Sequence, residues 1–295
     1  MIGNRYAWLR RIIRWQAMTI VDRKERRQWR NRRMEQMTNK LISDYKWGVS
    51  YSVFDGHELL EASIRAIRDH VDYINVVYQT KSWYGVPANS DLVPELKKLK
   101  KLGLIDELIE YKANPNIKAV KQECEKRNIG LRAARHAGVD YFMTMDTDEF
   151  YNGTEFESAK RKIIEQGITH SFCNIVGYGV MPTQQILAPT PSFVQFMSKI
   201  GHLSRLGKTR YDICLIDPTG RISRYSLFRN KCYFLSGIQM HHFSYVRKNV
   251  ITKLKNSSAK TNHNVTVNDL IKIDTVMVPD TFDLMPLFNQ FNKDK

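Results

Sequence analysis

The sequence contains few cysteines and no long apolar run, and both shortages exclude classes of protein. Its 295 residues include four cysteines, separated by 49, 41 and 18 positions: Cys124, Cys173, Cys214 and Cys232. Neither a CxxC pair nor a Cys/His zinc spacing occurs, so the pattern indicates neutral thiols in a reducing cytoplasm rather than a disulfide framework or a zinc site. No apolar run approaches the roughly 20 residues that a membrane-spanning helix needs.

Signals for export, repetition and disorder are also missing. Arg10, Arg11 and Arg14 interrupt the apolar stretch near the N-terminus, so a secretory signal is not expected. The sequence shows no internal repeat and no low-complexity tract, and 42% of its residues are hydrophobic against 26% charged. This composition is typical of an ordinary globular protein with a sizeable core.

Positive charge is in excess and unevenly distributed. The 46 Lys and Arg residues exceed the 30 Asp and Glu residues, which gives a net charge of +16. Residues 1–40 hold 12 basic and three acidic residues, a net charge of +9. A basic N-terminal block indicates a polyanionic partner, which is an anionic lipid surface, nucleic acid or a phosphorylated substrate.

The N-terminal segment is amphipathic as well as basic. At helical spacing one side carries Trp8, Leu9, Ile12, Ile13 and Trp15, and the other carries Arg10, Arg11 and Arg14. Tryptophan and isoleucine opposite arginine are typical of a helix at a membrane interface, so we expect residues 1–40 to bind an anionic membrane surface. The alternative is that the apolar side packs on the protein's own core.

From residue 47 onward, strand and helix patterns alternate through four rounds. Strand patterns occupy Trp47–Phe54, Tyr73–Tyr78, Glu107–Tyr111 and Tyr141–Met145. Helix patterns occupy Glu58–Arg68, Leu92–Leu102 and Lys118–Ala137, the last two ending at Gly103 and Gly138. The alternation predicts an α/β fold with a mostly parallel, Rossmann-like sheet flanked by helices, whose ligands bind at the carboxyl ends of the strands.

After residue 150 the alternation loosens. We expect a helix at Glu155–Gln166, a strand at Thr169–Val176 and a long, lid-like loop at Gly177–Gly207. Further strands are expected at Tyr211–Ile216, Ser223–Phe228 and Gly237–Ser244, before a basic helix at Lys248–Lys260. The chain is therefore predicted to comprise a basic helical segment (1–46), an α/β domain (47–250) and a helical and polar tail (251–295).

Three carboxylates follow directly on the apolar strand Tyr141–Met145. Asp146, Asp148 and Glu149 fall within four residues, and such a cluster at the end of a buried strand is self-repelling unless a cation lies between its members. Asp146 and Asp148 are two positions apart, so in extended backbone they face the same side. A hard ion such as Mg²⁺ or Mn²⁺ takes one or two carboxylates together with phosphate oxygens.

The residues around this cluster resemble a known family. RNIGLRAAR at 127–135, AGVDY at 137–141 and MDTDEF at 145–150 look, in this order, like the centre of a family 2 type glycosyltransferase with the GT-A fold. The resemblance covers residues 47–250. It implies that Asp146 and Asp148 bind a divalent ion, Mn²⁺ or Mg²⁺, which bridges the diphosphate of a nucleotide-sugar donor.

A second stretch, HHFSYVR at 241–247, resembles the HxSYVR segment of related bacterial enzymes. The resemblance implies that His242 completes the metal shell, while Arg247 and Lys253 hold the diphosphate. Imidazole suits Mn²⁺, and arginine offers phosphate two parallel hydrogen bonds. His241 and His242 point to opposite faces of a strand, so we expect only one of them to ligate. The place of His242 in the HxSYVR resemblance favours it over His241. The alternative is a pair of structural histidines.

Further donor contacts are expected on neighbouring elements. Arg127 and Arg135 lie on the helix before the acidic cluster, where they either neutralise phosphate or remain solvated. Many relatives carry an acidic residue at the end of the second strand to hold uracil, whereas this sequence has Gln79, which leaves the identity of the base open. Asp55, after the first strand, can supply an equivalent contact.

The catalytic base is the least defined part of the predicted site. Transfer with inversion needs a carboxylate that deprotonates the acceptor hydroxyl on the face opposite the leaving diphosphate. Asp212 is the first candidate, and Asp217 and Glu149 are the others. Glu149 is alternatively a residue that supports the metal ligands without binding the ion, or a contact for the acceptor. Retention, which needs no such base, stays open at this point.

Taken together, these features predict a metal-dependent glycosyltransferase on the inner face of the cytoplasmic membrane, with a bacterial surface glycan such as lipopolysaccharide or a lipid-linked precursor as acceptor. One alternative is a phage-type enzyme that glycosylates modified DNA bases. Nucleic acid is less favoured, because the excess charge lies on a Trp/Ile-rich helix rather than along a groove. The other alternative is a non-catalytic basic adaptor, against which the intact DTDE and HHFSYVR motifs argue.

Overall fold

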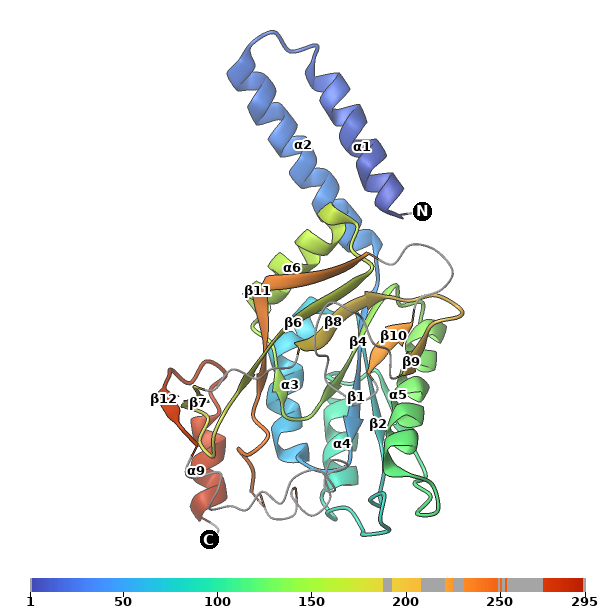
Figure 1. The fold of residues 1–295 in the computed structure, drawn as a ribbon, viewed down its shortest axis with the longest axis vertical. Helices are drawn as coiled ribbons and strands as arrows, with labels where there is room; N and C mark the ends of the chain where they lie inside the picture. The colour runs from blue at the N-terminus through green and yellow to red at the C-terminus, as the bar shows by residue number, and fades with distance from the viewer. Residues whose placement is uncertain are drawn as a thin grey trace.

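The structure is a computed structural model, which describes residues 2–187, 193–207, 221–224, 231–248, 250, 253 and 273–293. Its longest dimension runs from an N-terminal helical hairpin at one end to the carboxyl ends of the central strands at the other (Figure 1). No helix in these ranges is both long enough and apolar enough to cross a membrane.

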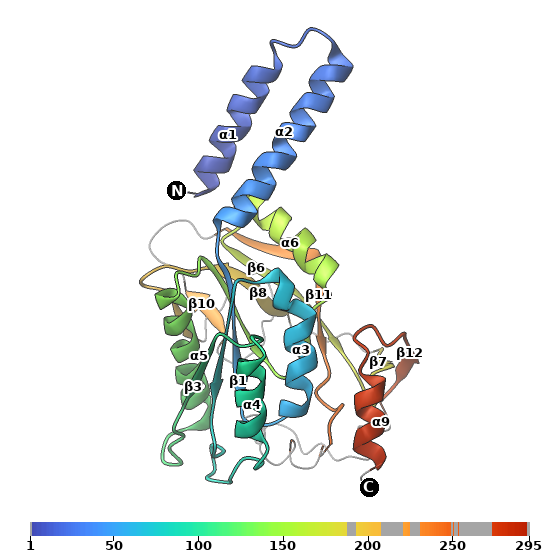
Figure 2. The ribbon, with the colours of Figure 1, turned by 180° about the vertical axis from the view of Figure 1, so that it is seen from behind.

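The N-terminal segment forms a hairpin of two helices. α1 spans Ile2–Ala17 and α2 spans Arg23–Asp44, and both views show them antiparallel and projecting from the body (Figures 1 and 2). The second helix begins after Asp22, whose side chain caps it by accepting a hydrogen bond from the Glu25 amide at 2.7 Å. In the part of α1 whose side chains are described, residues 6–17, the buried residues are Tyr6, Ile13 and Ala17. Part of the apolar side therefore packs on the protein itself.

The first half of the body is the predicted alternation of strands and helices. The parallel strands lie in the order β3-β2-β1-β4, with bounds Trp47–Val53 (β1), Tyr73–Tyr78 (β2), Glu107–Glu110 (β3) and Tyr141–Asp146 (β4). The helices are α3 (Leu60–Ile67, between 3₁₀ turns at His57–Leu59 and Arg68–His70), α4 (Leu92–Lys101) and α5 (Ala119–His136). Gly103 and Gly138 follow α4 and α5 in the left-handed conformation, as expected of helix-ending glycines.

The second half of the body completes an eight-stranded sheet of order β3-β2-β1-β4-β8-β6-β11-β5. β8 is antiparallel to both of its neighbours, whereas β6 and β11 are parallel. The bounds are Glu149–Phe150 (β5), Gly153–Gln166 (α6), His170–Gly177 (β6), Phe193–Lys199 (β8) and Cys232–His242 (β11). The fold is thus α/β, with a mostly parallel, Rossmann-like sheet flanked by helices, as predicted.

The segment Gly177–Gly207, expected to be a long loop, contains strands instead. Besides β8 it includes β7 (Gln184–Ile186) and β9 (Arg205–Gly207), and β9 pairs with β10 (Ile222–Arg224). β8 is buried in the middle of the sheet. Its short apolar run follows two prolines, so the sequence pattern does not indicate a strand there. The strand expected at Tyr211–Ile216 and most of the helix expected at Lys248–Lys260 lie outside the described residues.

The described part of the C-terminal region packs on the body. β12 (Thr275–Met277) pairs antiparallel with β7, and α9 (Met285–Lys293) follows it. Leu284 is buried in a cluster with Phe150 and Phe243. The described residues of the C-terminal region therefore pack on the domain that precedes them, and the boundary at residue 250 stays a prediction.

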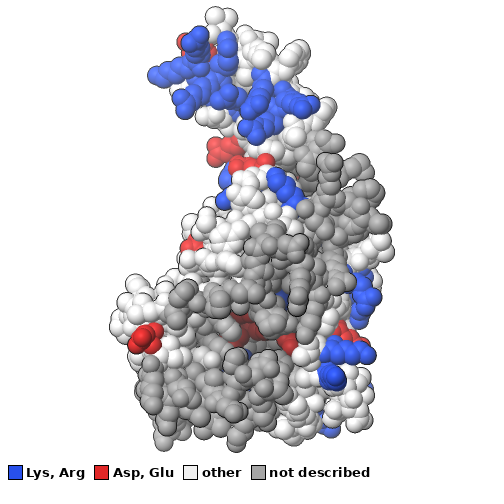
Figure 3. All heavy atoms as spheres, in the orientation of Figure 1, with Lys and Arg blue, Asp and Glu red and all other residues white. Residues whose placement is uncertain are grey.

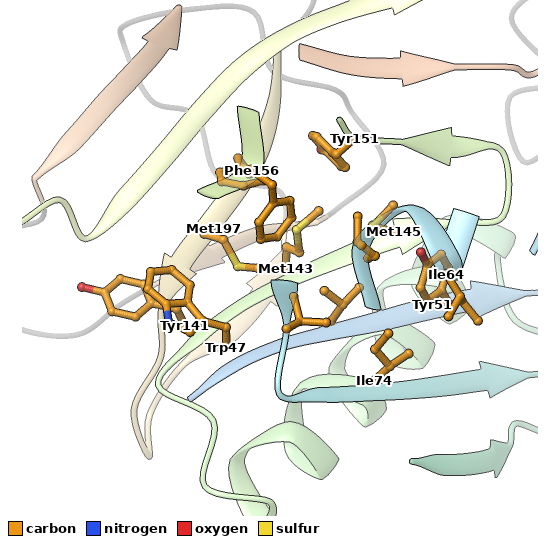
Figure 4. Close-up of a cluster of buried hydrophobic side chains, with 14 of the residues drawn as sticks. Trp47, Tyr51, Ile64, Ile74, Tyr141, Met143, Met145, Tyr151, Phe156 and Met197 are labelled. Carbon is orange, nitrogen blue, oxygen red and sulfur yellow. The ribbon is translucent and has the colours of Figure 1, made fainter. Parts of the chain in front are cut away.

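The core fills the space between the sheet and α3, α4 and α6 (Figure 4). Trp47 and Tyr141, at the starts of β1 and β4, stack with ring centroids 4.5 Å apart. On the other face, α5 approaches the sheet closely: a Cβ on Gly130 would lie 1.8 Å from the Ser50 hydroxyl oxygen. The Asn75 amide donates to the Gly130 carbonyl at 3.0 Å. This contact accounts for glycine in the RNIG motif and holds α5 beside the carboxyl ends of the strands.

Candidate functional site

The acidic cluster lies at the carboxyl end of β4, on the edge that α/β sheets use for ligands. Asp146 ends β4, and Thr147 and Asp148 form the turn that leads into β5. The Thr147 hydroxyl donates to the Asp55 carbonyl at 3.0 Å, which ties the loop after β1 to this turn. Gly56 makes the approach possible, because its φ is 73° and a Cβ there would lie 2.7 Å from the Thr147 hydroxyl oxygen.

Asp146 is held by two buried arginines. Arg127 donates to both carboxylate oxygens, at 2.9 and 3.0 Å, and Arg221 donates to one at 3.1 Å. Arg127 is fixed in turn by Thr144 on β4 and Glu123 on α5. Burial alone would raise the pKa of Asp146, but the two arginines lower it to about 2. Asp146 is therefore ionised at neutral pH, with its charge already balanced.

Asp148 is buried among three cationic groups. Arg247 donates to one carboxylate oxygen, Lys253 Nζ lies 3.1 Å from the same oxygen, and His242 Nε2 lies 3.7 Å from the other. Burial opposes ionisation, but these neighbours, Lys253 and Arg247 above all, hold the pKa of Asp148 well below its usual range. The three residues that the HHFSYVR resemblance assigns to the site thus converge on this one carboxylate.

Glu149 forms a fully buried ion pair with Arg221, a residue not predicted from the sequence. Arg221 Nη1 donates to both Glu149 oxygens, at 2.6 and 2.9 Å, and Glu149 also accepts from the Asp146 amide at 3.0 Å. Burial raises the pKa of Glu149 despite the arginine. These contacts are those of a residue that positions Asp146 and Arg221, and a role for Glu149 as catalytic base stays a prediction.

The two histidines of β11 point to opposite faces, as strand alternation predicts. His242 lies beside Asp148, whereas His241 Nδ1 lies 2.8 Å from the Tyr178 hydroxyl. Burial lowers the pKa of His241 to about 4. Burial also acts to lower the pKa of His242, but the Asp148 carboxylate outweighs it and raises that pKa above its usual value. His242 is therefore the histidine that the fold brings to the acidic turn.

Unsatisfied polar atoms mark the side of the site next to β1 and β2. Asp55 Oδ2 and Arg247 Nη1 lie 3.3 Å apart, yet neither has a hydrogen-bond partner among the described residues. The Gln79 side chain is buried and donates to the Lys81 carbonyl at 2.9 Å, while its Oε1 has no partner in the same ranges. Buried polar atoms without partners are costly, so both positions are suited to a ligand that supplies the missing bonds.

Lys126 lies beside these atoms and was not predicted either. Its ammonium group is buried, donates to the Val53 carbonyl at 2.8 Å, and lies 5.7 Å from the centre of the Trp83 ring. Burial lowers the pKa of Lys126 to about 7. Tyr111 meets Trp83 edge-on, with ring centroids 6.0 Å apart. The ends of β1, β2 and β3 thus carry a cluster of two aromatic rings and one buried ammonium group.

The two unpredicted residues differ in the signal that they carry in the sequence. Lys126 directly precedes Arg127, so its position next to a predicted site residue on the same helix could have identified it as a second candidate cation. Arg221 is isolated after Gly220, and only the course of the chain brings it to Asp146, 75 residues away. No periodicity or spacing identifies such a residue.

Two predicted residues are not placed at the site. Arg135 lies two turns beyond Arg127 on α5, about 12 Å further along the helix, and donates to the carbonyls of Gly201 and Ser204 at 3.4 and 3.5 Å. Because α5 runs antiparallel to the strands it connects, this end lies at the opposite edge of the sheet. Arg135 therefore does not lie with Arg127 at the acidic turn, and a contact between Arg135 and the donor stays a prediction. The candidate bases Asp212 and Asp217 lie outside the described residues.

The available ligands fit a divalent ion only after a rearrangement. Asp146, Asp148 and His242 offer two carboxylates and an imidazole, which suit Mn²⁺. Within the described ranges, however, no group of three or more His, Cys, Asp and Glu side chains is arranged to hold a metal ion. The carboxylates are bound by arginine and lysine instead. A phosphate group that took over Arg247 and Lys253 would free Asp148 for a metal.

A cavity of about 1210 Å³ opens beside the acidic turn. It extends from Phe54 and Asp55 at the end of β1, past α3 and the start of α4, to Phe291 on α9. Asp55 lines this cavity and also faces Arg247, so the two features adjoin. The volume exceeds the roughly 300–1,000 Å³ of sites for one small molecule, which leaves room for a substrate of several units.

No protein-family model matches the chain, and no curated protein matches its sequence. Among solved structures, S. aureus TarS 1-349 is 10% identical with a TM-score of 0.44, over 76% of this chain and 68% of that one. TarS 1-349 in complex with UDP-GlcNAc is 12% identical with a TM-score of 0.36, over 50% and 37%. A longer S. aureus TarS structure is 12% identical with a TM-score of 0.34, over 45% and 22%. The matched region therefore spans about a fifth of that longer chain.

Proposed function

We propose that the protein is a glycosyltransferase that transfers a sugar from a nucleotide-sugar donor. The observation that carries the proposal is the gathering of charge at the carboxyl edge of the sheet. Three carboxylates of one turn are bound there by basic side chains from α5, from Arg221 and from the segment after β11. Guanidinium and ammonium groups around these strand ends suit a diphosphate, and the carboxylates suit the divalent ion that accompanies it.

Arg247 and Lys253 are the proposed ligands of the diphosphate. Both contact Asp148, and Arg247 also faces the unsatisfied Asp55 oxygen. A diphosphate offers more charge and more acceptor oxygens than one carboxylate, so it competes well for both side chains. Asp146, Asp148 and His242 are then the proposed ligands of Mn²⁺ or Mg²⁺. When bound, the ion supplies positive charge that stabilises the leaving diphosphate.

The proposed transfer needs a base as well as a leaving group. The acceptor hydroxyl oxygen bonds to the anomeric carbon of the sugar, while the bond from that carbon to the diphosphate breaks and the diphosphate keeps the electron pair. For inversion a carboxylate takes the hydroxyl proton. Asp212 is the proposed base. Glu149 is less suited, because Arg221 binds both of its oxygens.

The proposed acceptor is a bacterial surface glycan, such as lipopolysaccharide or a lipid-linked precursor. The cavity beside Asp55 is large enough for a glycan of several sugars. The +9 charge of residues 1–40 and the exposure of Trp8 and Trp15 favour an anionic membrane as the place of action. We place the enzyme on the inner face of the cytoplasmic membrane.

Thermal unfolding in the presence of nucleotide-sugars tests the proposed donor site. A panel of UDP- and GDP-linked sugars, each with and without Mn²⁺, is expected to include at least one that raises Tm only with the ion. Asp148→Asn should remove that shift. Asp69→Asn, an exposed carboxylate far from the acidic turn, is the matched control and should keep it. No shift with any donor, or a full shift in Asp148→Asn, contradicts the proposal.

A further inference from the structure

The hairpin ends in an exposed apolar tip, which we define as residues 15–21. Trp15 and Met18 are each 71% exposed and Val21 is 90% exposed. They lie where α1 turns into α2, at the end of the hairpin furthest from the body (Figure 1). Trp8, further back on α1, is also exposed. Large apolar side chains gathered at one projecting point mark an interaction surface.

Basic side chains surround this tip. The exposed ones nearest to it are Arg10, Arg11, Arg14, Arg23, Lys24 and Arg27. Figure 3 shows two blue patches of lysine and arginine toward the outer end of the hairpin, with a small red patch of acidic side chains beside one of them. None of these six side chains forms an ion pair with a described residue. These charges are therefore available to an anionic partner.

The structure also excludes the protein's own core as the partner of these apolar groups. The inward side of α1 is already packed by Tyr6, Ile13 and Ala17, and the tip faces away from the body. A second copy of the hairpin would bring two segments of like charge together. A nucleic acid would satisfy the arginines but leave Trp15, Met18 and Val21 in water. An anionic bilayer satisfies both kinds of side chain.

The hairpin is attached rigidly at its other end. Leu41 and Tyr45 at the end of α2 belong to the main core, as does Tyr6 of α1. The Arg161 guanidinium on α6 donates to the Asn39 side chain at 2.8 Å. The hairpin therefore acts as an arm whose direction is set by the domain.

This arm places the candidate site far from its tip. α2 has 22 residues, about 33 Å of helix. It leads directly into β1, and the seven residues of β1 carry the chain about 23 Å further, toward the edge that holds the acidic turn. The tip and the acidic turn thus lie at opposite ends of the molecule, on the order of 50 Å apart.

We infer that the protein docks tip-first on an anionic membrane, and that its acceptor is the distant end of an extended glycan rather than a sugar next to the lipid. A saccharide linked directly to a lipid cannot reach a site held at the far end of an upright arm. A chain that extends several tens of ångströms from the leaflet can. The docking part stands on the hairpin alone, whereas the acceptor part rests on the proposed glycosyltransferase function.

Flotation with vesicles of phosphatidylcholine, with and without phosphatidylglycerol, tests the docking surface. The wild type should float only with the anionic vesicles. The triple variant Trp15→Ser, Met18→Ser, Val21→Ser should bind the anionic vesicles at least roughly tenfold more weakly than the wild type. The matched control replaces two exposed leucines of the body, Leu102→Ser and Leu203→Ser, and should bind as wild type. Full binding by the tip variant, or retention by duplex DNA in place of vesicles, overturns the assignment.

Quenching by brominated lipids tests the orientation without any donor. Bound wild type should lose fluorescence, Trp15→Phe should remove most of that loss, and Trp83→Phe, beside the acidic turn, should leave it unchanged. A quenching loss of equal size in both variants overturns tip-first docking.

Transfer assays on vesicles then address acceptor length: faster transfer to short lipid-linked acceptors than to long ones overturns the acceptor inference. Absence of any donor binding in solution would instead count against the proposed function and leave the docking result intact.

Discussion

The acidic turn and the N-terminal hairpin both concentrate charge, but they arrange it in opposite ways. At the turn, Asp146, Asp148 and Glu149 are each bound by arginine or lysine inside the fold. On the hairpin, the basic side chains nearest to the tip (Arg10, Arg11, Arg14, Arg23, Lys24 and Arg27) are exposed, and none of them forms an ion pair with a described residue. Buried charges couple strongly because little water screens them, whereas exposed charges are screened by salt. Substitutions at the turn should therefore change folding and donor binding together, and substitutions on the hairpin should change surface binding alone.

The largest effect is expected from Asp148→Asn. It leaves Arg247 and Lys253 without their shared carboxylate, and an uncompensated buried charge costs about 4 kcal/mol. Urea unfolding should show this loss in the free energy of unfolding. Asp69→Asn should stay within about 0.5 kcal/mol of wild type. If Asp148→Asn changed the free energy of unfolding as little as that control does, the charges at the turn would be no more strongly coupled to one another than charges on the surface.

A slightly smaller loss, about 3 kcal/mol, is expected from Arg221→Met, because Glu149 can offset the missing arginine by taking up a proton. Arg65→Met, which removes an exposed pair with Glu61, should cost less than about 1 kcal/mol. In a double-mutant cycle, Arg221→Met with Glu149→Gln should cost less than the sum of the two single changes. Additive losses would mean that this buried pair does not act as a unit.

The pH dependence of folding stability should distinguish the buried acidic turn from exposed carboxylates, with an effect of intermediate size. Asp146 has a pKa of about 2 in the fold, below the usual value of 3.8, so its ionised form stabilises the folded state. That contribution is present above pH 4 and is lost as the pH falls toward 2, about 2 kcal/mol in all. Unfolding of Asp146→Asn by urea across this range should lack this part of the slope, while Asp69→Asn should keep it. Parallel curves for wild type and Asp146→Asn would contradict the assignment.

The smallest effect on folding is expected from the hairpin. Replacing Arg23, Arg27 and Arg30 by glutamine should change the free energy of unfolding by less than about 0.5 kcal/mol. The same variant should bind anionic vesicles more weakly at low salt, by about 1 kcal/mol per residue, and the difference should shrink at high salt. Replacing Lys97, Lys100 and Lys101 on α4 by glutamine is the control and should leave vesicle binding unchanged. Equal weakening of vesicle binding in both variants would show that the hairpin contributes no more than any other basic part of the surface.

Periodicity was enough to predict most of the sheet and its helices. The first four strands and α3, α4, α5 and α6 were expected close to their observed bounds, because burial on both faces and glycine-ended helices leave clear patterns. β8 was not expected, since its short apolar run follows two prolines and its partners lie far away in sequence. The turn between α1 and α2 depends on one cap at Asp22, a signal easily missed within a charged segment.

The candidate site was predictable where its residues lie next to a strand end. Asp146 and Asp148 follow from that placement, whereas His242 was chosen by its place in the HxSYVR resemblance. The ion pairs could not be predicted, because which cation meets which carboxylate depends on contacts between distant segments. Arg127 and Arg135 look alike on one helix, yet only the first reaches the acidic turn, because the second lies about 12 Å further from it.

Electron paramagnetic resonance of Mn²⁺ tests the central claim most directly. The claim is that Asp148 becomes available to a metal ion only when a diphosphate takes over Arg247 and Lys253. The spectrum of free Mn²⁺ should therefore persist when the ion is added to the protein alone, and should be lost when UDP or GDP is also added, beyond the loss that the nucleotide causes by itself. Asp148→Asn should show no such additional loss. Tight binding of Mn²⁺ without nucleotide, or equal binding by Asp148→Asn, would contradict the account.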